Sequence, residues 1–136
     1  AKKYFTITVK SIGKAEMPKV FNDGSKFVTK VTALSSTNDT DCYVVAKNFS
    51  SRVENMMIAN NDGSNRTFTV KYYEKAANTT HTLIDTHTLA TKTTTNVFTA
   101  DTPLYIHAED KLIVDAGTAD TLVVVISAEE FFDPTY

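Results

Sequence analysis

The sequence predicts a single antiparallel β-sandwich, and its composition, its residue spacing and its turns all indicate this fold class. The 136 residues include 22 Thr but only 4 Gly and 3 Pro, and β-branched Thr favours a pleated strand over a helix. Apolar residues recur at a spacing of two rather than 3.6 in most windows, as they do in half-buried strands. We count roughly eight to ten strands at intervals of about 8–12 residues, which is typical of a jelly-roll-like sandwich.

The strands are expected in order along the chain. The first alternating window is Tyr4–Lys10. The second, Lys26–Leu34, places Phe27, Thr29, Val31 and Ala33 on one face of a strand. Further strands are expected at Cys42–Ala46, Val53–Ala59, Arg66–Tyr73, Thr80–Leu89, Thr93–Thr99, Leu104–Ile106, Lys111–Val114 and Thr121–Ser127. Within the last one, Val123–Ile126 is apolar on both faces, so it is predicted to be a central strand.

Two glycine-containing turns predict β-hairpins. In Asn60–Ser64, the Asp62-Gly63 step can supply the positive φ that a tight hairpin needs between the strands 53–59 and 66–73. In Asp115–Asp120, Gly117 lies between the strands 111–114 and 121–127. We therefore expect each of these strand pairs to be neighbours in one sheet.

The chain divides into a sandwich domain and two ends. Residues 1–26 read as an N-terminal arm or loop-rich segment, interrupted by Gly13, Pro18 and Gly24, residues 27–132 as the β-sandwich, and residues 133–136 as a C-terminal tail. Aromatic residues near both ends are predicted to contact neighbouring proteins. These candidates are Tyr4, Phe5, Phe21, Phe131, Phe132 and Tyr136. The alternative is that Phe131 and Phe132 cover an edge of their own domain.

Charge and cysteine content exclude several classes of partner and scaffold. With 14 Lys+Arg against 16 Asp+Glu and a pI near 5.9, the chain has no basic stripe for nucleic acid. The N-terminal apolar pattern alternates and stops at Lys10, so no membrane-spanning segment or export signal is expected. Cys42 is the single cysteine; no disulfide can form within one chain, and Cys42 is predicted to be a small buried apolar residue.

The chain carries none of the common signatures of a catalytic or metal site. His81 and His87 would share a strand face with Asp85, but they would lie about 20 Å apart at roughly 3.3 Å per residue. The adjacent carboxylates Glu109-Asp110 and Glu129-Glu130 would point to opposite faces of a strand, as solvated charges at strand ends. We therefore predict no enzyme activity, catalytic residue, metal or cofactor.

From Phe27 to Phe132 the order of features resembles a type of small β-sandwich protein found in the virions of tailed bacteriophages. The first matching stretch runs from Met57-Ile58-Ala59-Asn60 through the Gly63-Ser64 turn to Thr67-Phe68-Thr69-Val70. The second contains Leu104, the acidic turn Glu109-Asp110, the strand Lys111–Val114 and the final strand Leu122–Ser127. The match departs from the group at His107-Ala108-Glu109-Asp110, where a Gly is usual, and it does not include residues 1–26.

This resemblance implies a repeated, non-catalytic subunit of a phage particle, located in the virion. The expected function is that of a capsid decoration or cement protein, bound to the major capsid protein through its termini; a neck or tail component is the alternative. A homo-oligomer is expected, with a trimer favoured. A carbohydrate- or receptor-binding sandwich is a further alternative, for which Tyr72, Tyr73 and Tyr105 are the candidate aromatic platform.

Overall fold

The computed structural model describes residues 25–134. The predicted strand Tyr4–Lys10 and the candidate contact residues Tyr4, Phe5, Phe21 and Tyr136 lie outside the described residues. The described part contains nine strands. They are β1 (Ser25–Ala33), β2 (Thr40–Val44), β3 (Phe49–Asn60), β4 (Arg66–Glu74), β5 (Thr79–Leu89), β6 (Thr94–Phe98), β7 (Leu104–Ile106), β8 (Lys111–Ala116) and β9 (Leu122–Phe132).

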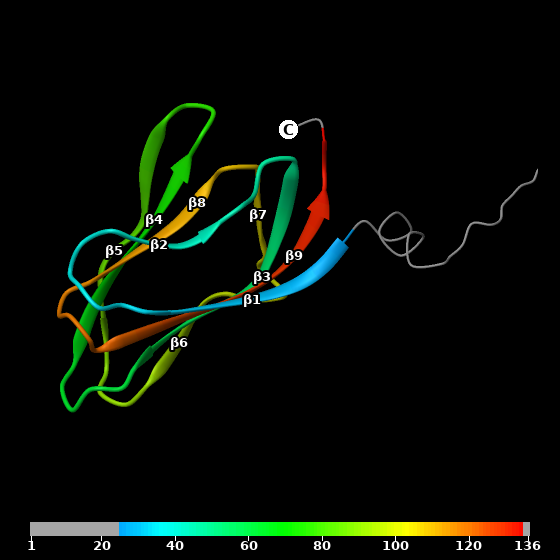
Figure 1. Cartoon of the computed structure of the whole chain (residues 1–136). Helices are drawn as coiled ribbons and strands as arrows, with labels where there is room; N and C mark the ends of the chain where they lie inside the picture. Colours follow the sequence, from blue (N-terminus) through cyan, green and yellow to red (C-terminus); the bar gives the residue numbers. More distant parts are fainter. Residues whose placement is uncertain (1–24, 135–136) are drawn as a thin grey trace, which may run out of the picture.

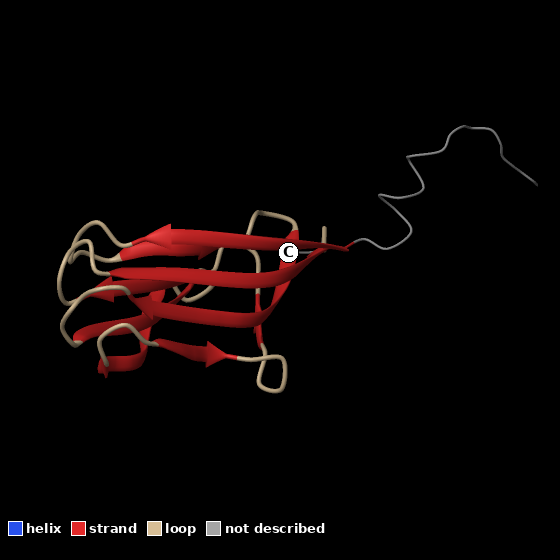
Figure 2. Ribbon diagram, turned by 90° about the horizontal axis from the view of Figure 1, so that it is seen from below, coloured by secondary structure: helices blue, strands red, loops and turns tan. Residues whose placement is uncertain are grey.

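These strands form two antiparallel sheets, which confirms the predicted all-β sandwich (Figures 1 and 2). The five-stranded sheet has the order β1-β9-β3-β6, with β7 also paired to β3, and the four-stranded sheet has the order β2-β8-β4-β5. Strands that follow one another in sequence often belong to opposite sheets. This is the strand order of a jelly roll.

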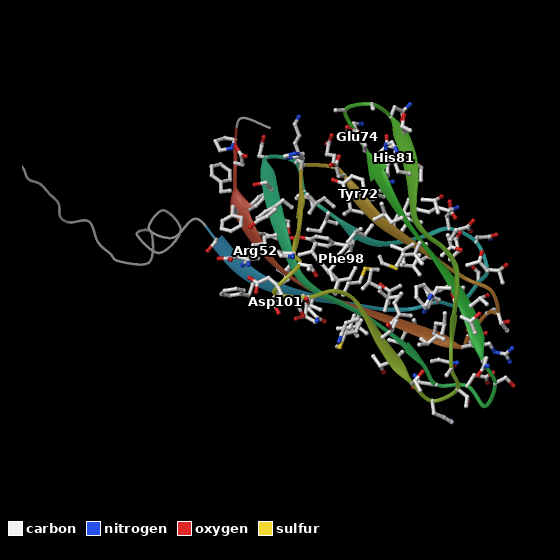
Figure 3. The ribbon with its side chains drawn as sticks, turned by 180° about the vertical axis from the view of Figure 1, so that it is seen from behind. Arg52, Tyr72, Glu74, His81, Phe98 and Asp101 are labelled. Atoms are coloured by element: carbon white, nitrogen blue, oxygen red, sulfur yellow. The ribbon has the colours of Figure 1, made fainter. Side chains whose placement is uncertain are left out.

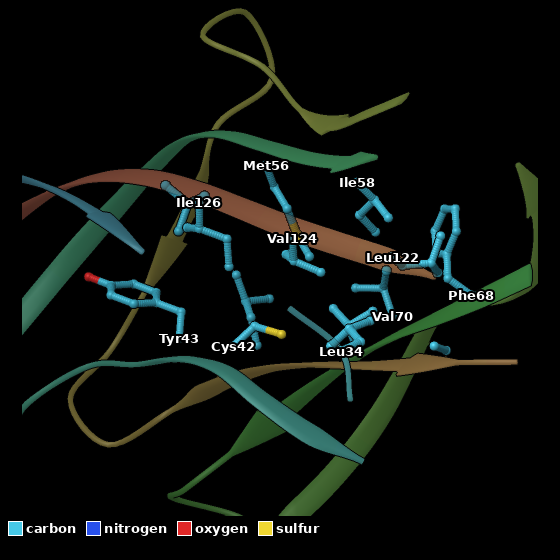
Figure 4. Close-up of a cluster of buried hydrophobic side chains, with 14 of the residues drawn as sticks. Leu34, Cys42, Tyr43, Met56, Ile58, Phe68, Val70, Leu122, Val124 and Ile126 are labelled. Carbon is cyan, nitrogen blue, oxygen red and sulfur yellow. The ribbon is translucent and has the colours of Figure 1, made fainter. Parts of the chain in front are cut away.

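The core lies between the two sheets and is built by alternation along the central strands. In β9, Leu122, Val124, Ile126 and Ala128 are buried, and the intervening residues are half-buried on the outer face. β9 pairs with both β1 and β3, so the predicted central position of Val123–Ile126 is confirmed. Figure 4 shows side chains from both sheets meeting in this core, among them Tyr43, Met56 and Phe68.

Cys42 is part of this core, as predicted. Its side chain is 4% exposed, and burial raises the pKa of its thiol to about 11. A thiol with such a pKa remains protonated near neutral pH, so Cys42 contributes packing and little nucleophilicity.

The two predicted glycine hairpins are wrong. β3 and β4 lie in opposite sheets, and so do β8 and β9, so each turn carries the chain across the sandwich. Neither Gly63 nor Gly117 adopts a φ in the left-handed region. The 60–65 turn is instead fixed by buried Asn60, whose Nδ2 donates to the carbonyl oxygens of Ser64 at 2.9 Å and Leu89 at 3.0 Å.

The hairpin that does form joins β4 to β5 and extends beyond the rest of the four-stranded sheet (Figure 1). Its turn closes with the Asn78 N–H donating to the Lys75 carbonyl oxygen at 3.1 Å, and Asn78 has a φ of 48°. All of β5 except Ile84 and Leu89 is exposed.

Two of the predicted solvated carboxylates are in fact held by tyrosines. Asp110 is 3% exposed and accepts hydrogen bonds from the Tyr72 hydroxyl at 2.5 Å and the Lys75 N–H at 2.8 Å. Glu130 accepts one from the buried Tyr43 hydroxyl at 2.6 Å. The hydroxyls compensate the loss of hydration, which is why these carboxylates can leave bulk water.

Candidate functional site: the outer face of the five-stranded sheet

The two aromatic residues predicted at the C-terminal end do not form one surface. β9 extends to Phe132, five residues beyond the predicted end at Ser127, so Phe131 and Phe132 belong to a strand and project to opposite faces. Phe132 packs edge-on against Phe49, with ring centroids 5.7 Å apart. Phe132 nevertheless remains 59% exposed, whereas half-buried Phe131 lies on the outer face beside Ser50.

That outer face carries the most exposed large apolar side chains of the described residues. Phe27 on β1 is 78% exposed, Val31 on β1 is 66% exposed, and Tyr105 on β7 is 66% exposed. We call this surface the apolar face: the outward-pointing residues of β1, β9, β3, β6 and β7. Soluble proteins rarely leave large apolar groups clustered on one face unless the face binds something.

Strand register aligns four of these residues in one row across the sheet. Phe27 is opposite Glu129, Glu129 is opposite Arg52, and Arg52 is opposite Tyr105. We call these four residues the aromatic row. A second row, the aliphatic row, joins Val31, Val125 and Met57. Residues directly opposite in antiparallel strands have Cβ atoms about 5 Å apart, so each row forms a continuous surface.

Small and hydroxyl-bearing residues make up most of the remaining apolar face. Thr29, Ser127 and Asn55 form the row between the aromatic and aliphatic rows, and Ala33, Val123, Ala59 and Thr94 form the last one. A shallow hollow of 180 Å³ lies at the other end, between Tyr105, His107 and Phe131. This hollow is bordered by the exposed Tyr105 ring and half-buried Phe131.

The few charges on the apolar face lie at its centre. The Arg52 Nη1 donates to Glu54 at 2.9 Å, and the side chains of both residues are 30% exposed. The Arg52 Nε is buried and has no hydrogen-bond partner within residues 25–134. Within residues 25–134, the half-buried Glu129 carboxylate also has neither an ion pair nor a hydrogen bond. Figure 3 shows Arg52 well away from Glu74 and His81 on the β4–β5 hairpin.

The outer face of the four-stranded sheet is different, because its lysines and aspartates pair with one another, although Asp115 Oδ1 is buried without a hydrogen bond within residues 25–134. Lys71 lies 3.0 Å from Asp39 and 3.1 Å from Asp115. Contact with Asp115 and with Lys71 lowers the pKa of Asp39, whereas burial and the neighbouring Asp39 raise the pKa of Asp115. In addition, Lys111 lies 3.1 Å from Asp41 and over the Tyr73 ring.

The three tyrosines considered as a sugar platform do not converge. Tyr72 and Tyr73 are neighbours on β4 and point to opposite faces of the four-stranded sheet, while Tyr105 lies on the other sheet. Burial and the hydrogen bond to Asp110 raise the pKa of Tyr72. Tyr73 donates to Asn78 Oδ1 at 2.8 Å. Of these three tyrosines, Tyr105 alone has an exposed ring on the apolar face.

Sequence reasoning did not identify the apolar face as a site. The 26–34 pattern separates Phe27 and Val31 from Val28 and Lys30, but both sets contain apolar residues, so periodicity alone does not say which set faces the core. The register between four strands that are distant in sequence produces the aromatic row. One sequence signal was present: Phe27 and Val31 alternate with Thr29 on a single strand face.

The histidines of the described residues make other contacts and do not gather into a metal site. Within residues 25–134, no three His, Cys, Asp or Glu side chains gather closely enough to hold a metal ion. His81 pairs with Glu74 at 3.2 Å, and His87 contacts the Phe68 ring. The same residues include no helix that could cross a membrane.

Comparison with known proteins adds only distant likenesses. No family model and no curated protein sequence matches the chain. A chain from Bacillus endospore appendages, described as a novel family of disulfide-linked pili, is 9% identical with a TM-score of 0.46, covering 95% of this chain and 99% of that one. The CBM22-1–GH10 modules of Clostridium thermocellum xylanase 10B, complexed with xylohexaose, give 12% identity, a TM-score of 0.33, and coverage of 82% and 26%. Both are too distant to indicate a function.

Proposed function

We propose that this protein is a non-catalytic structural subunit that docks onto other protein chains through its apolar face. The observation that carries the proposal is the exposure of Phe27, Val31 and Tyr105 on one side of the five-stranded sheet. Flat, apolar surfaces with little charge are what protein partners cover, whereas small-molecule sites are concave with convergent polar groups. The shallow hollow beside Tyr105 does not have that form.

The assembly that we propose is the virion of a tailed bacteriophage, where the chain serves as a capsid decoration protein or as a neck or tail component. The sequence resemblance between Phe27 and Phe132 suggests this assembly. A jelly roll supports such a role because it gives a rigid platform whose outer faces are free for contacts. Phe131 adds to the docking surface, while Phe132, which is 59% exposed beside Phe49, lies at the end of the same strand.

Mass spectrometry of purified, salt-washed particles tests this proposal directly. We expect the chain to be present at a fixed stoichiometry to the major capsid protein, and cryo-microscopy to show the apolar face against a neighbouring chain. Absence of the chain from washed particles would exclude a virion role. A chain that is present with its apolar face exposed to solvent would exclude the docking surface.

A carbohydrate-binding module is the second candidate function, and exposed Tyr105 is the observation that favours it. Tyrosine rings stack on sugar rings, and Phe27 and Phe131 on the same face would extend the platform. A glycan array separates the two functions. Binding that is lost on Tyr105→Ala and kept on Tyr73→Ala would favour the module over the structural subunit.

A further inference from the structure

We propose that the apolar face binds the apolar face of a second copy of this chain, related to the first by a two-fold axis that runs along the strands between β9 and β3. This inference rests on the proposed docking function and names the partner. It comes from the order of residues across the sheet, because the aromatic row is self-complementary under this symmetry.

The aromatic row reads aromatic, acidic, basic, aromatic: Phe27, Glu129, Arg52, Tyr105. A two-fold axis between β9 and β3 reverses the row in the partner. Each Glu129 then faces the partner's Arg52, and each Phe27 faces the partner's Tyr105. The aliphatic row behaves in the same way, since Val125 on β9 faces the partner's Met57 on β3.

The central charges have unused capacity for this contact. The Glu129 carboxylate has no ionic or hydrogen-bonding partner in the described part of its own chain. Arg52 has five N–H donors, and its contact with Glu54 is made through Nη1. When two faces meet and exclude water, an unpaired carboxylate is costly, so a guanidinium from the partner is the complement it needs.

The size of the apolar face is sufficient for a weak, specific dimer. Four strands at about 4.8 Å and nine residues at about 3.3 Å give a footprint of roughly 19 by 30 Å, or about 1,100 Å² over both copies. Specific, stable interfaces usually bury roughly 1,200–2,000 Å², so this contact lies just below that range, among weak and transient interfaces. We therefore expect association that depends on protein concentration.

Charge exchange between two variants tests the pairing. In Glu129→Arg, both central charges of the row are positive; in Arg52→Glu, both are negative. Each variant alone should repel its own copies and sediment as a monomer. An equimolar mixture should recover dimers, because every charge then faces an opposite one in the partner. Charges that act only within one chain cannot produce this recovery, so a mixture of folded variants that stays monomeric would contradict the proposal.

Cross-linking gives a second readout that does not alter the central charges. Ala33 and Thr94 are exposed, small, and lie at opposite ends of one row. Three strand spacings of about 4.8 Å separate them by roughly 14 Å within a chain, whereas packed sheets lie about 10 Å apart. A short bis-maleimide that reaches only the smaller distance should join Ala33→Cys/Thr94→Cys chains into dimers. Buried Cys42 should not react, and Ala33→Cys alone should remain uncross-linked.

Sedimentation of the full-length wild-type chain over a wide concentration range separates this inference from the proposed function. A concentration-dependent dimer is expected. A monomer at every concentration, or a trimer, would overturn the two-fold pairing. If such a chain is nevertheless found in washed particles, the structural role stands and its partner is another protein. If the dimer forms but particles lack the chain, the pairing stands and the virion role fails.

Discussion

The two outer faces of this sandwich are built from strands of similar length, yet they dispose of their polar and apolar groups in opposite ways. On the four-stranded sheet, Lys71 lies between Asp39 and Asp115, and Lys111 pairs with Asp41. On the five-stranded sheet, Glu129 has no ionic partner within residues 25–134, and Phe27 and Val31 are left in solvent.

The difference is between a surface whose charges are paired within the chain and a surface that exposes apolar groups to solvent. Charges that pair within the chain remain hydrated at their edges and require nothing from a neighbour. Exposed apolar groups around an unpaired charge gain free energy only when another surface removes them from water. This is why we propose the five-stranded sheet, and not the four-stranded one, as the surface for association.

The largest expected effect comes from making the apolar face resemble an ordinary Thr-rich face. Phe27→Thr combined with Val31→Thr keeps β-branched residues on β1 but removes its two most exposed apolar groups. We expect self-association to weaken by at least about 100-fold, since burying each such side chain contributes roughly 1.5–3 kcal/mol. Analytical ultracentrifugation measures the change.

A matched control uses the other sheet. Val44 on β2 and Leu83 on β5 are 46% and 45% exposed, so Val44→Thr with Leu83→Thr makes the same kind of change away from the apolar face. Self-association should be unchanged in this control. Equal weakening by both pairs of substitutions would mean that association does not depend on the apolar face.

A smaller effect is expected on the charged face. Lys71→Met should lower the free energy of unfolding slightly near pH 7, because Asp39 and Asp115 then repel each other without a cation between them. Self-association should remain. Denaturant unfolding measures the loss, with Lys47→Met, an exposed lysine in the loop between β2 and β3, as the control.

The loss of unfolding free energy caused by Lys71→Met should be smaller in acid, because Asp115 becomes protonated there. Its pKa in the folded chain is raised above 3.8, so its contribution to stability falls as the pH rises from about that value through the raised pKa. Lys71 opposes this fall. Below its pKa values in both the folded and the unfolded chain, Asp115 is neutral. Lys71→Met then lowers the free energy of unfolding by less. A loss that is larger at pH 3 than at pH 7 would contradict the assigned roles.

The smallest expected effect is a difference between the pKa values of the Asp39 and Asp115 carboxylates. Carbon-detected NMR titration should show Asp39 titrating below 3.8 and Asp115 above it. In Lys71→Met both pKa values should rise, because Lys71 lowers each of them in the wild-type chain. Identical titration curves for Asp39 and Asp115 would show that the charged face does not couple them.

Local pattern was enough to predict the strands, because alternation is set by residues close together in the chain. Phe27 and Val31 were correctly placed together on one strand face, and Val123–Ile126 was correctly predicted to be central. The end of β9 was missed because Glu129-Glu130 looks like a solvated terminus, whereas Tyr43 draws Glu130 inward.

Turn chemistry was a poor guide to pairing, and the two glycine turns show why. Asp62-Gly63 and Gly117 mark changes of chain direction, but a turn that reverses a strand within one sheet and a turn that crosses to the other sheet use similar residues. Long-range strand pairing distinguishes the two kinds of turn, because β3 pairs with β9 and β4 pairs with β8. Asn60 then joins the end of β3 to the carbonyl groups of Leu89 and Ala90 at the end of β5.

The sequence by itself determined the fold class, the strand faces and the burial of Cys42, since these depend on neighbouring residues and on simple alternation. Only the tertiary structure decided that Phe27, Glu129, Arg52 and Tyr105 lie in one row. These residues come from four strands spread over about a hundred positions, and no local preference relates them. Their alignment follows from the register of two sheets closing around a shared core, because a slip of one residue would turn every buried side chain of a strand outward.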